Sequence, residues 1–99
     1  MVTQFGENNL TLLEIVRDLA QLDGDKTIYA AEPFTEESDA ILGPEPELQS
    51  LPKDAEERGL KYFLEVFIAR EVLEDWVPEE APTLQDKCGR LIKYAITDA

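Results

Sequence analysis

Carboxylates are the side chains of this 99-residue chain whose number and spacing could do chemistry. Asp and Glu number 22 against nine Lys and Arg, and the chain has no His, so its formal net charge is −13. Carboxylates can ligate a divalent cation, act as a general acid and base, or attract a basic partner. The spacing of these residues and their neighbours decide which role applies.

Asp23 and Asp25 could begin a calcium loop of the EF-hand type. That loop requires Gly at its sixth position and Glu at its twelfth, where this sequence has Ile28 and Phe34. A looser divalent-cation site in an acidic cluster stays open, although the sequence identifies no metal ligand. A carboxylate pair for glycoside chemistry needs a cleft, and a chain of this length has little room for one.

The absence of His and the single cysteine, Cys88, exclude most other catalytic and metal sites. Zinc sites built from Cys and His, Ser-His-Asp triads and Cys-His pairs all need residues that are missing. The glycines are too scattered to form a phosphate-binding loop. We therefore expect no enzyme, cofactor or metal site, and a small enzyme using two carboxylates is the remaining catalytic alternative.

The negative charge is concentrated in two blocks of the sequence. Residues 32–57 hold nine acidic residues against Lys53 alone, and residues 71–86 hold six and no basic residue. Glu71, Glu74 and Asp75 fall in the last turns of an expected helix, where each negative charge opposes the helix dipole by about 0.3 to 1 kcal/mol. Charge placed against its own helix favours a role outside the fold.

We interpret the two blocks as surfaces that bind a basic protein. Clustered carboxylates speed association with a positive partner and repel nucleic acid and anionic membranes. An aromatic residue beside the second block could anchor arginine side chains. The alternative is that the acidity only keeps the surface solvated. The predicted partner-binding residues are Glu36, Glu37, Asp39, Glu45, Glu47, Glu71, Glu74, Asp75, Trp76, Glu79 and Glu80.

A helix is expected from Thr11 to Leu22, where apolar residues recur at helical spacing. Thr11 and Glu14 form a capping box at its start, and Gly24 is expected to supply a left-handed cap after its end. Another helix is expected after Thr83, which caps it, with Cys88 buried on its apolar face.

The strands are expected at 26–31, at 39–42 returning beside the first, and at 60–64. The third strand is predicted to turn into a helix from Val66 to Trp76, and one long helix is the rival interpretation. The aromatic side chains of this region are expected to fill the core. The rest of 32–57 is predicted to be mostly loop, packed by Phe34, Ile41, Leu48 and Leu51.

The expected fold is α+β, with a small two- or three-stranded antiparallel sheet packed against about three helices in one domain covering 1–99. A three-helix domain with a minor hairpin is the alternative. The start of the chain has no signal-peptide pattern and no segment could span a bilayer, so we assign the protein to the cytoplasm.

The segments GLKYFLEVFIAREVLEDW and PTLQDKCGRLIKYAITDA resemble small acidic bacterial or phage proteins, among them toxin immunity proteins and anti-CRISPR inhibitors. The resemblance is one of size, charge and composition over most of the chain. It implies an inhibitor that occupies the positive site of a nuclease or nucleic-acid-binding complex. The alternative is a structural or regulatory domain that forms a homodimer through the apolar residues of 59–76.

Overall fold

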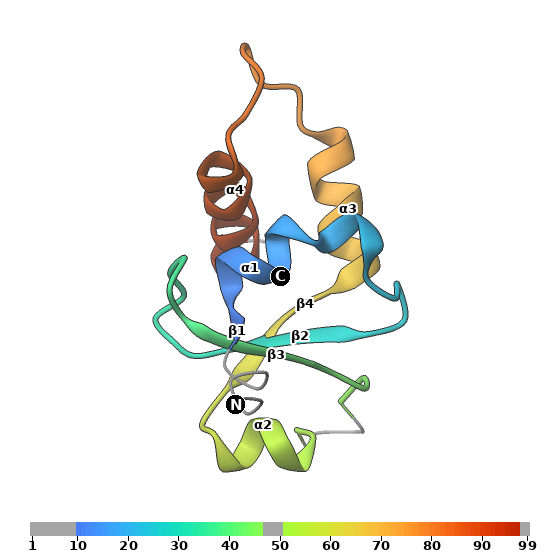
Figure 1. The fold of residues 1–99 in the computed structure, drawn as a ribbon, viewed down its shortest axis with the longest axis vertical. Helices are drawn as coiled ribbons and strands as arrows, with labels where there is room; N and C mark the ends of the chain where they lie inside the picture. Colours follow the sequence, from blue (N-terminus) through green and yellow to red (C-terminus); the bar gives the residue numbers. More distant parts are fainter. Residues whose placement is uncertain (1–9, 47–50, 98–99) are drawn as a thin grey trace, which may run out of the picture.

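The computed structural model describes residues 10–46 and 51–97, which form an antiparallel sheet with helices on both faces (Figure 1). In the sheet, β2 (Thr27–Ala30) pairs on one side with β3 (Asp39–Gly43) and on the other with β4 (Lys61–Glu65). The α+β fold expected from the sequence is confirmed.

The sheet has four strands, one more than the sequence predicted, because a short strand, β1 (Leu10–Thr11), pairs with the outer side of β3. The strand order is β1-β3-β2-β4. A strand of two residues is too short to show an alternating pattern, so only its pairing with Asp39 and Ala40 identifies it.

The change from strand to helix near Glu65 is confirmed, and the rival single long helix is wrong. Strand β4 ends at Glu65 and α3 (Val66–Asp75) begins at the next residue. The β2–β4 register shifts between Ile28 and Tyr29, which is a β-bulge. A bulge interrupts the alternation of a strand, so Phe63 and Leu64 are both buried although they are neighbours.

Helix α1 (Leu12–Arg17) begins with the predicted capping box. The Glu14 amide donates to Thr11 Oγ1 at 3.2 Å, and the Thr11 amide donates to Glu14 Oε1 at 2.9 Å. The helix is shorter than expected and continues as the 3-10 turn η2 (Leu19–Gln21). The left-handed cap predicted at Gly24 is wrong, since among the described glycines only Gly59 has a positive φ.

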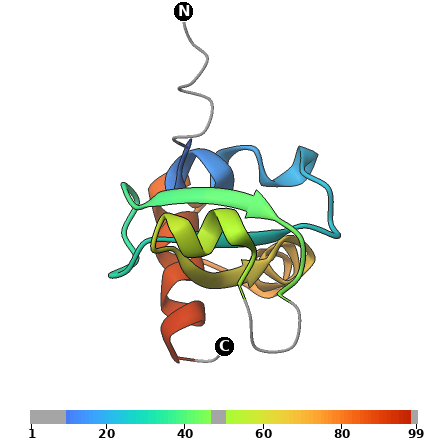
Figure 2. The same cartoon turned by 90° about the horizontal axis from the view of Figure 1, so that it is seen from below.

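Helix α2 (Lys53–Glu57) lies in the stretch predicted to be mostly loop, and five residues are too few to show a helical period. It covers the face of the sheet opposite the other helices (Figure 2), and Ala55 packs there with Tyr29 and Leu60. Ile41 and Leu51 pack against the same cluster as predicted, and Leu48 lies outside the described residues.

The main core lies between the sheet and α1, α3 and α4 (Leu84–Thr97). Thr83 caps α4 as predicted, because its hydroxyl accepts from the Asp86 amide at 3.0 Å. Cys88 is fully buried, and no helix among residues 10–46 and 51–97 has the length and apolar character needed to cross a bilayer.

The apolar side chains of 59–76 are mostly buried in the core of their own chain. The prediction that the aromatic side chains here fill the core holds for Phe63, whereas Phe67 is 45% exposed and Tyr62 is half-buried. Trp76, the exception among them, is half-buried beside the acidic end of α3.

Candidate functional site

The acidic end of α3 projects away from the sheet (Figure 1). Glu71, Glu74 and Asp75 lie in the last two turns of α3, as predicted, and the last turn holds no basic residue. Trp76 follows as the C-cap, and the next exposed carboxylates are on the connection to α4. We call Glu74, Asp75, Glu79 and Glu80 the tip surface.

Glu74 is exposed like its neighbours in the tip surface, but it also lines a hollow whose other charged residues are basic. It lines a hollow between α1 and α3 together with Arg17, Arg70 and Lys87. Asp75, Glu79 and Glu80 do not line this hollow and are exposed. Most of the negative charge of the tip surface is therefore directed to solvent.

A second acidic surface lies on the connection between β2 and β3. We call Glu32, Glu36, Glu37 and Asp39 the loop surface. The Ser38 hydroxyl accepts from the Thr35 amide at 2.8 Å and donates to the Pro33 carbonyl at 3.2 Å.

Helix α1 also holds this connection in place, because the Leu13 amide donates to the Glu36 carbonyl at 3.0 Å. The carboxylates of the loop surface thus extend from a fixed backbone. The burial of Cys88 raises the pKa of its thiol to about 11, and the nearby Glu36 carboxylate adds to this rise.

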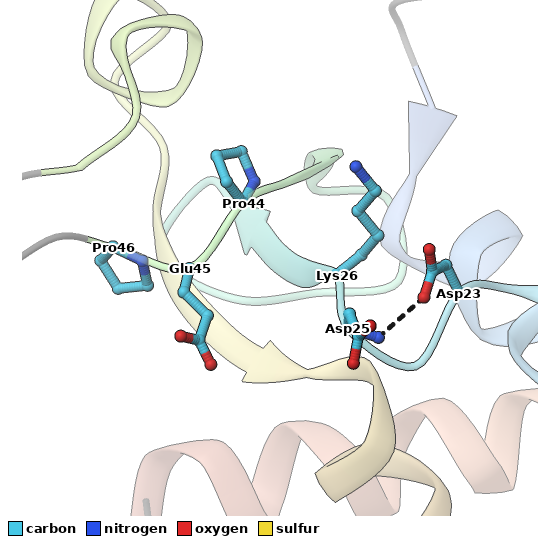
Figure 3. A pocket seen from close by; sticks show the side chains of 6 residues that line it. All are labelled: Asp23, Asp25, Lys26, Pro44, Glu45 and Pro46. Atoms are coloured by element: carbon cyan, nitrogen blue, oxygen red, sulfur yellow. Dashed lines mark hydrogen bonds between the residues drawn. The ribbon is translucent and has the colours of Figure 1, made fainter.

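The third acidic surface was missed by sequence reasoning, which considered Asp23 and Asp25 only as a calcium loop. Asp23, Asp25 and Glu45 line a hollow with Lys26, Pro44 and Pro46 (Figure 3). We call these three carboxylates the sheet-end surface. Antiparallel pairing of Thr27 with Gly43 brings the residues before β2 and after β3 to one end of the sheet. This surface could have been predicted only from the register of β2 and β3, which pairs Thr27 with Gly43.

The backbone around the sheet-end surface is held from two sides. Arg70 donates from Nε and Nη2 to the Leu19 carbonyl at 3.1 and 2.9 Å, and also to the Leu22 carbonyl. On the other side, the Tyr29 hydroxyl donates to the Pro44 carbonyl. Burial raises the pKa of Tyr29, and the Glu45 carboxylate adds to the rise, so this hydroxyl stays protonated at neutral pH.

No three Asp, Glu or Cys side chains in the described part of the chain are placed to hold a metal ion. The ion pair between Arg17 and Asp18, at 3.0 Å, includes none of the predicted partner-binding residues. The carboxylates of the three surfaces are thus neither a metal centre nor part of this pair.

The predicted partner-binding residues lie on three separate parts of the molecule. Asp39 begins β3 and Glu45 follows its end, and the strand from Asp39 to Gly43 spans about 13 Å at roughly 3.3 Å per residue. The tip surface lies about 15 Å beyond the sheet at the far end of α3. Glu47 lies outside the described residues. One partner must therefore extend over more than one of these surfaces to contact the whole predicted set.

No family model, curated protein or solved structure shows a significant match to this chain. The resemblance to small acidic inhibitors stays a prediction from size, charge and composition.

Proposed function

We propose that this protein is a stoichiometric inhibitor that binds the basic surface of another protein through its carboxylates. The partner is a nuclease or a nucleic-acid-binding complex, in which the carboxylates occupy positions that phosphate groups otherwise take. The protein itself does not bind nucleic acid, because its charge repels phosphates.

One observation carries this proposal: the acidic end of α3 opposes its own helix. Glu71, Glu74 and Asp75 face the negative end of the helix dipole without a basic residue in the last turn. Solvation of the surface does not require this placement, since carboxylates at the start of a helix would solvate it equally well and stabilise the helix. A binding role explains why Glu71 and Asp75 lie where they cost stability.

The test is capture of partners from the source cell's lysate at low salt, followed by elution with a salt step and mass spectrometry. We expect one basic nuclease or nucleic-acid-binding complex near a one-to-one ratio, whose activity falls when the purified protein is added back. The matched bait carries Glu79→Lys, Glu80→Lys, Glu36→Lys and Glu37→Lys, and it should capture much less. Equal capture by both baits, or capture with no effect on the partner's activity, would contradict the proposal.

A further inference from the structure

A groove runs between the β2–β3 connection and the second half of α4. It consists of two adjoining hollows of about 570 and 460 Å³, one lined by Phe34 and Ile96 and the other by Glu37 and Ile92. Residues 32–37 form one wall and residues 92–96 form the other, and we call this feature the α4 groove.

The floor of the α4 groove is apolar and well supported. Ile96 is 65% exposed, although it lies one helical turn from Ile92 on the same side of α4. Phe34 is half-buried, and its ring packs edge-on against the core residue Phe63 with centroids 5.0 Å apart. The groove is thus formed before any partner binds, which lowers the entropy cost of binding.

The edge of the α4 groove that the β2–β3 connection forms is lined by negative charges only. Glu32, Glu36 and Glu37 line its two hollows, and no basic residue lines either of them. On the opposite side of α4, Lys87 lines the separate hollow that contains Glu74. The wall on α4 includes the exposed Lys93, so the negative edge lies on the side of the β2–β3 connection alone, above an apolar floor.

We propose that the α4 groove binds a basic amphipathic segment of the partner protein. Apolar side chains of that segment pack on Phe34, Ile92 and Ile96, and its Arg or Lys side chains pair with Glu32, Glu36 and Glu37. A second copy of this chain does not fit, because each copy carries a net charge of −13. The inference rests on the proposed function, and it adds a contact at the loop surface to the binding role inferred for the acidic end of α3.

The test uses a labelled synthetic peptide of Leu and Arg arranged as an amphipathic helix. A peptide of the same composition, scrambled so that the Leu residues share no face, is the matched control. Binding is measured by fluorescence anisotropy at low salt and is located by two-dimensional NMR of the isotope-labelled protein. We expect the patterned peptide to bind more tightly and to shift amide signals of 32–37 and 92–96.

Three variants distinguish binding of the peptide in the α4 groove from its general electrostatic attraction to the acidic protein. Ile96→Ala removes exposed apolar surface without changing the charge, and it should weaken the patterned peptide about fivefold to tenfold. Glu36→Lys with Glu37→Lys should weaken it further than Glu79→Lys with Glu80→Lys, although both pairs change the net charge from −13 to −9. Circular dichroism checks that each variant is folded.

Several results would overturn the inference. These are equal binding of the two peptides, shifts centred on the tip surface, an Ile96→Ala variant that binds as the parent does, or no binding of either peptide. None of them refutes the proposed function, which the lysate capture tests separately. Failure of that capture, with the peptide still bound in the groove, would refute the function and leave the groove as a binding site.

Discussion

Reversal of Asp75 should stabilise the protein, whereas reversal of Glu74 should not. Both carboxylates lie in the last turn of α3, so Asp75→Lys and Glu74→Lys each replace an unfavourable interaction with the helix dipole by a favourable one. That change is worth about 0.6 to 2 kcal/mol at low salt. Asp75→Lys also converts a repulsive pair with Glu71, four residues earlier, into an attractive one, which adds about 0.4 to 1 kcal/mol.

Reversal of Glu74 is not expected to stabilise the protein, because basic residues line the same hollow as Glu74. Glu74 shares a hollow with Arg17, Arg70 and Lys87, and a lysine at this position would bring a fourth cation into that hollow. The repulsion offsets the gain at the helix dipole. We therefore expect Asp75→Lys to raise the free energy of unfolding by about 1 to 3 kcal/mol, or the Tm by at least about 4 °C, and Glu74→Lys to give no increase.

The assay is urea denaturation followed by circular dichroism, because urea is uncharged and leaves electrostatic effects unscreened. The measurement is repeated in molar salt, where the Debye length falls to about 3 Å and the stabilisation by Asp75→Lys should shrink. If Asp75→Lys destabilises the protein at low salt, the Asp75 carboxylate stabilises the folded state. The observation that carries the proposed function would then be refuted.

Further predictions concern single positions. Cys88 should react with a thiol reagent at pH 8 only after the protein unfolds, because its thiol is buried and its pKa is raised to about 11. The raised pKa also makes stability depend on pH. The contribution of Cys88 to stability is present below its usual pKa of 9 and is lost as the pH rises to 11. Gly89→Ala should stabilise α4 by about 0.5 to 1 kcal/mol, because the added Cβ meets nothing within 4 Å. Gly24→Ala should cost about 1 kcal/mol, since its Cβ would lie 3.3 Å from Arg70 Nη1 and displace a guanidinium that donates to two carbonyls. Urea denaturation measures both effects, and a stabilising Gly24→Ala would contradict the assigned role of Arg70.

The parts of the fold that could be predicted have local signals. The Thr11–Glu14 capping box and the buried face of α4 follow from side chains three or four residues apart, and both are confirmed. The parts that were missed depend on distant residues. Strand β1 exists only through its pairing with β3, and α2 is fixed by the packing of Ala55 under Tyr29.

The same distinction applies to the candidate site. The acidic end of α3 could be predicted from the sequence, because the position of a charge within a helix relative to the helix dipole depends only on nearby residues. The sequence could not show that Asp25 and Glu45 line one hollow, or that β3 carries Asp39 and Glu45 to opposite ends of the sheet. The α4 groove was missed for a related reason, since Phe34 and Ile96 are distant in sequence and are brought together only by the tertiary fold.

The separation of the acidic surfaces determines how salt affects binding. Ile96 in the α4 groove is twelve residues along α4 from Leu84, which is near the tip surface, a distance of about 18 Å. At about 0.01 M salt the Debye length is near 30 Å, so every carboxylate attracts an approaching basic partner and any double reversal slows association equally. At about 0.15 M the length falls to 8 Å, and only carboxylates near the contact still act. Reversal of Glu36 and Glu37 should then still slow association, and a variant with both reversals that associates as fast as the parent at this salt would exclude the loop surface from the contact.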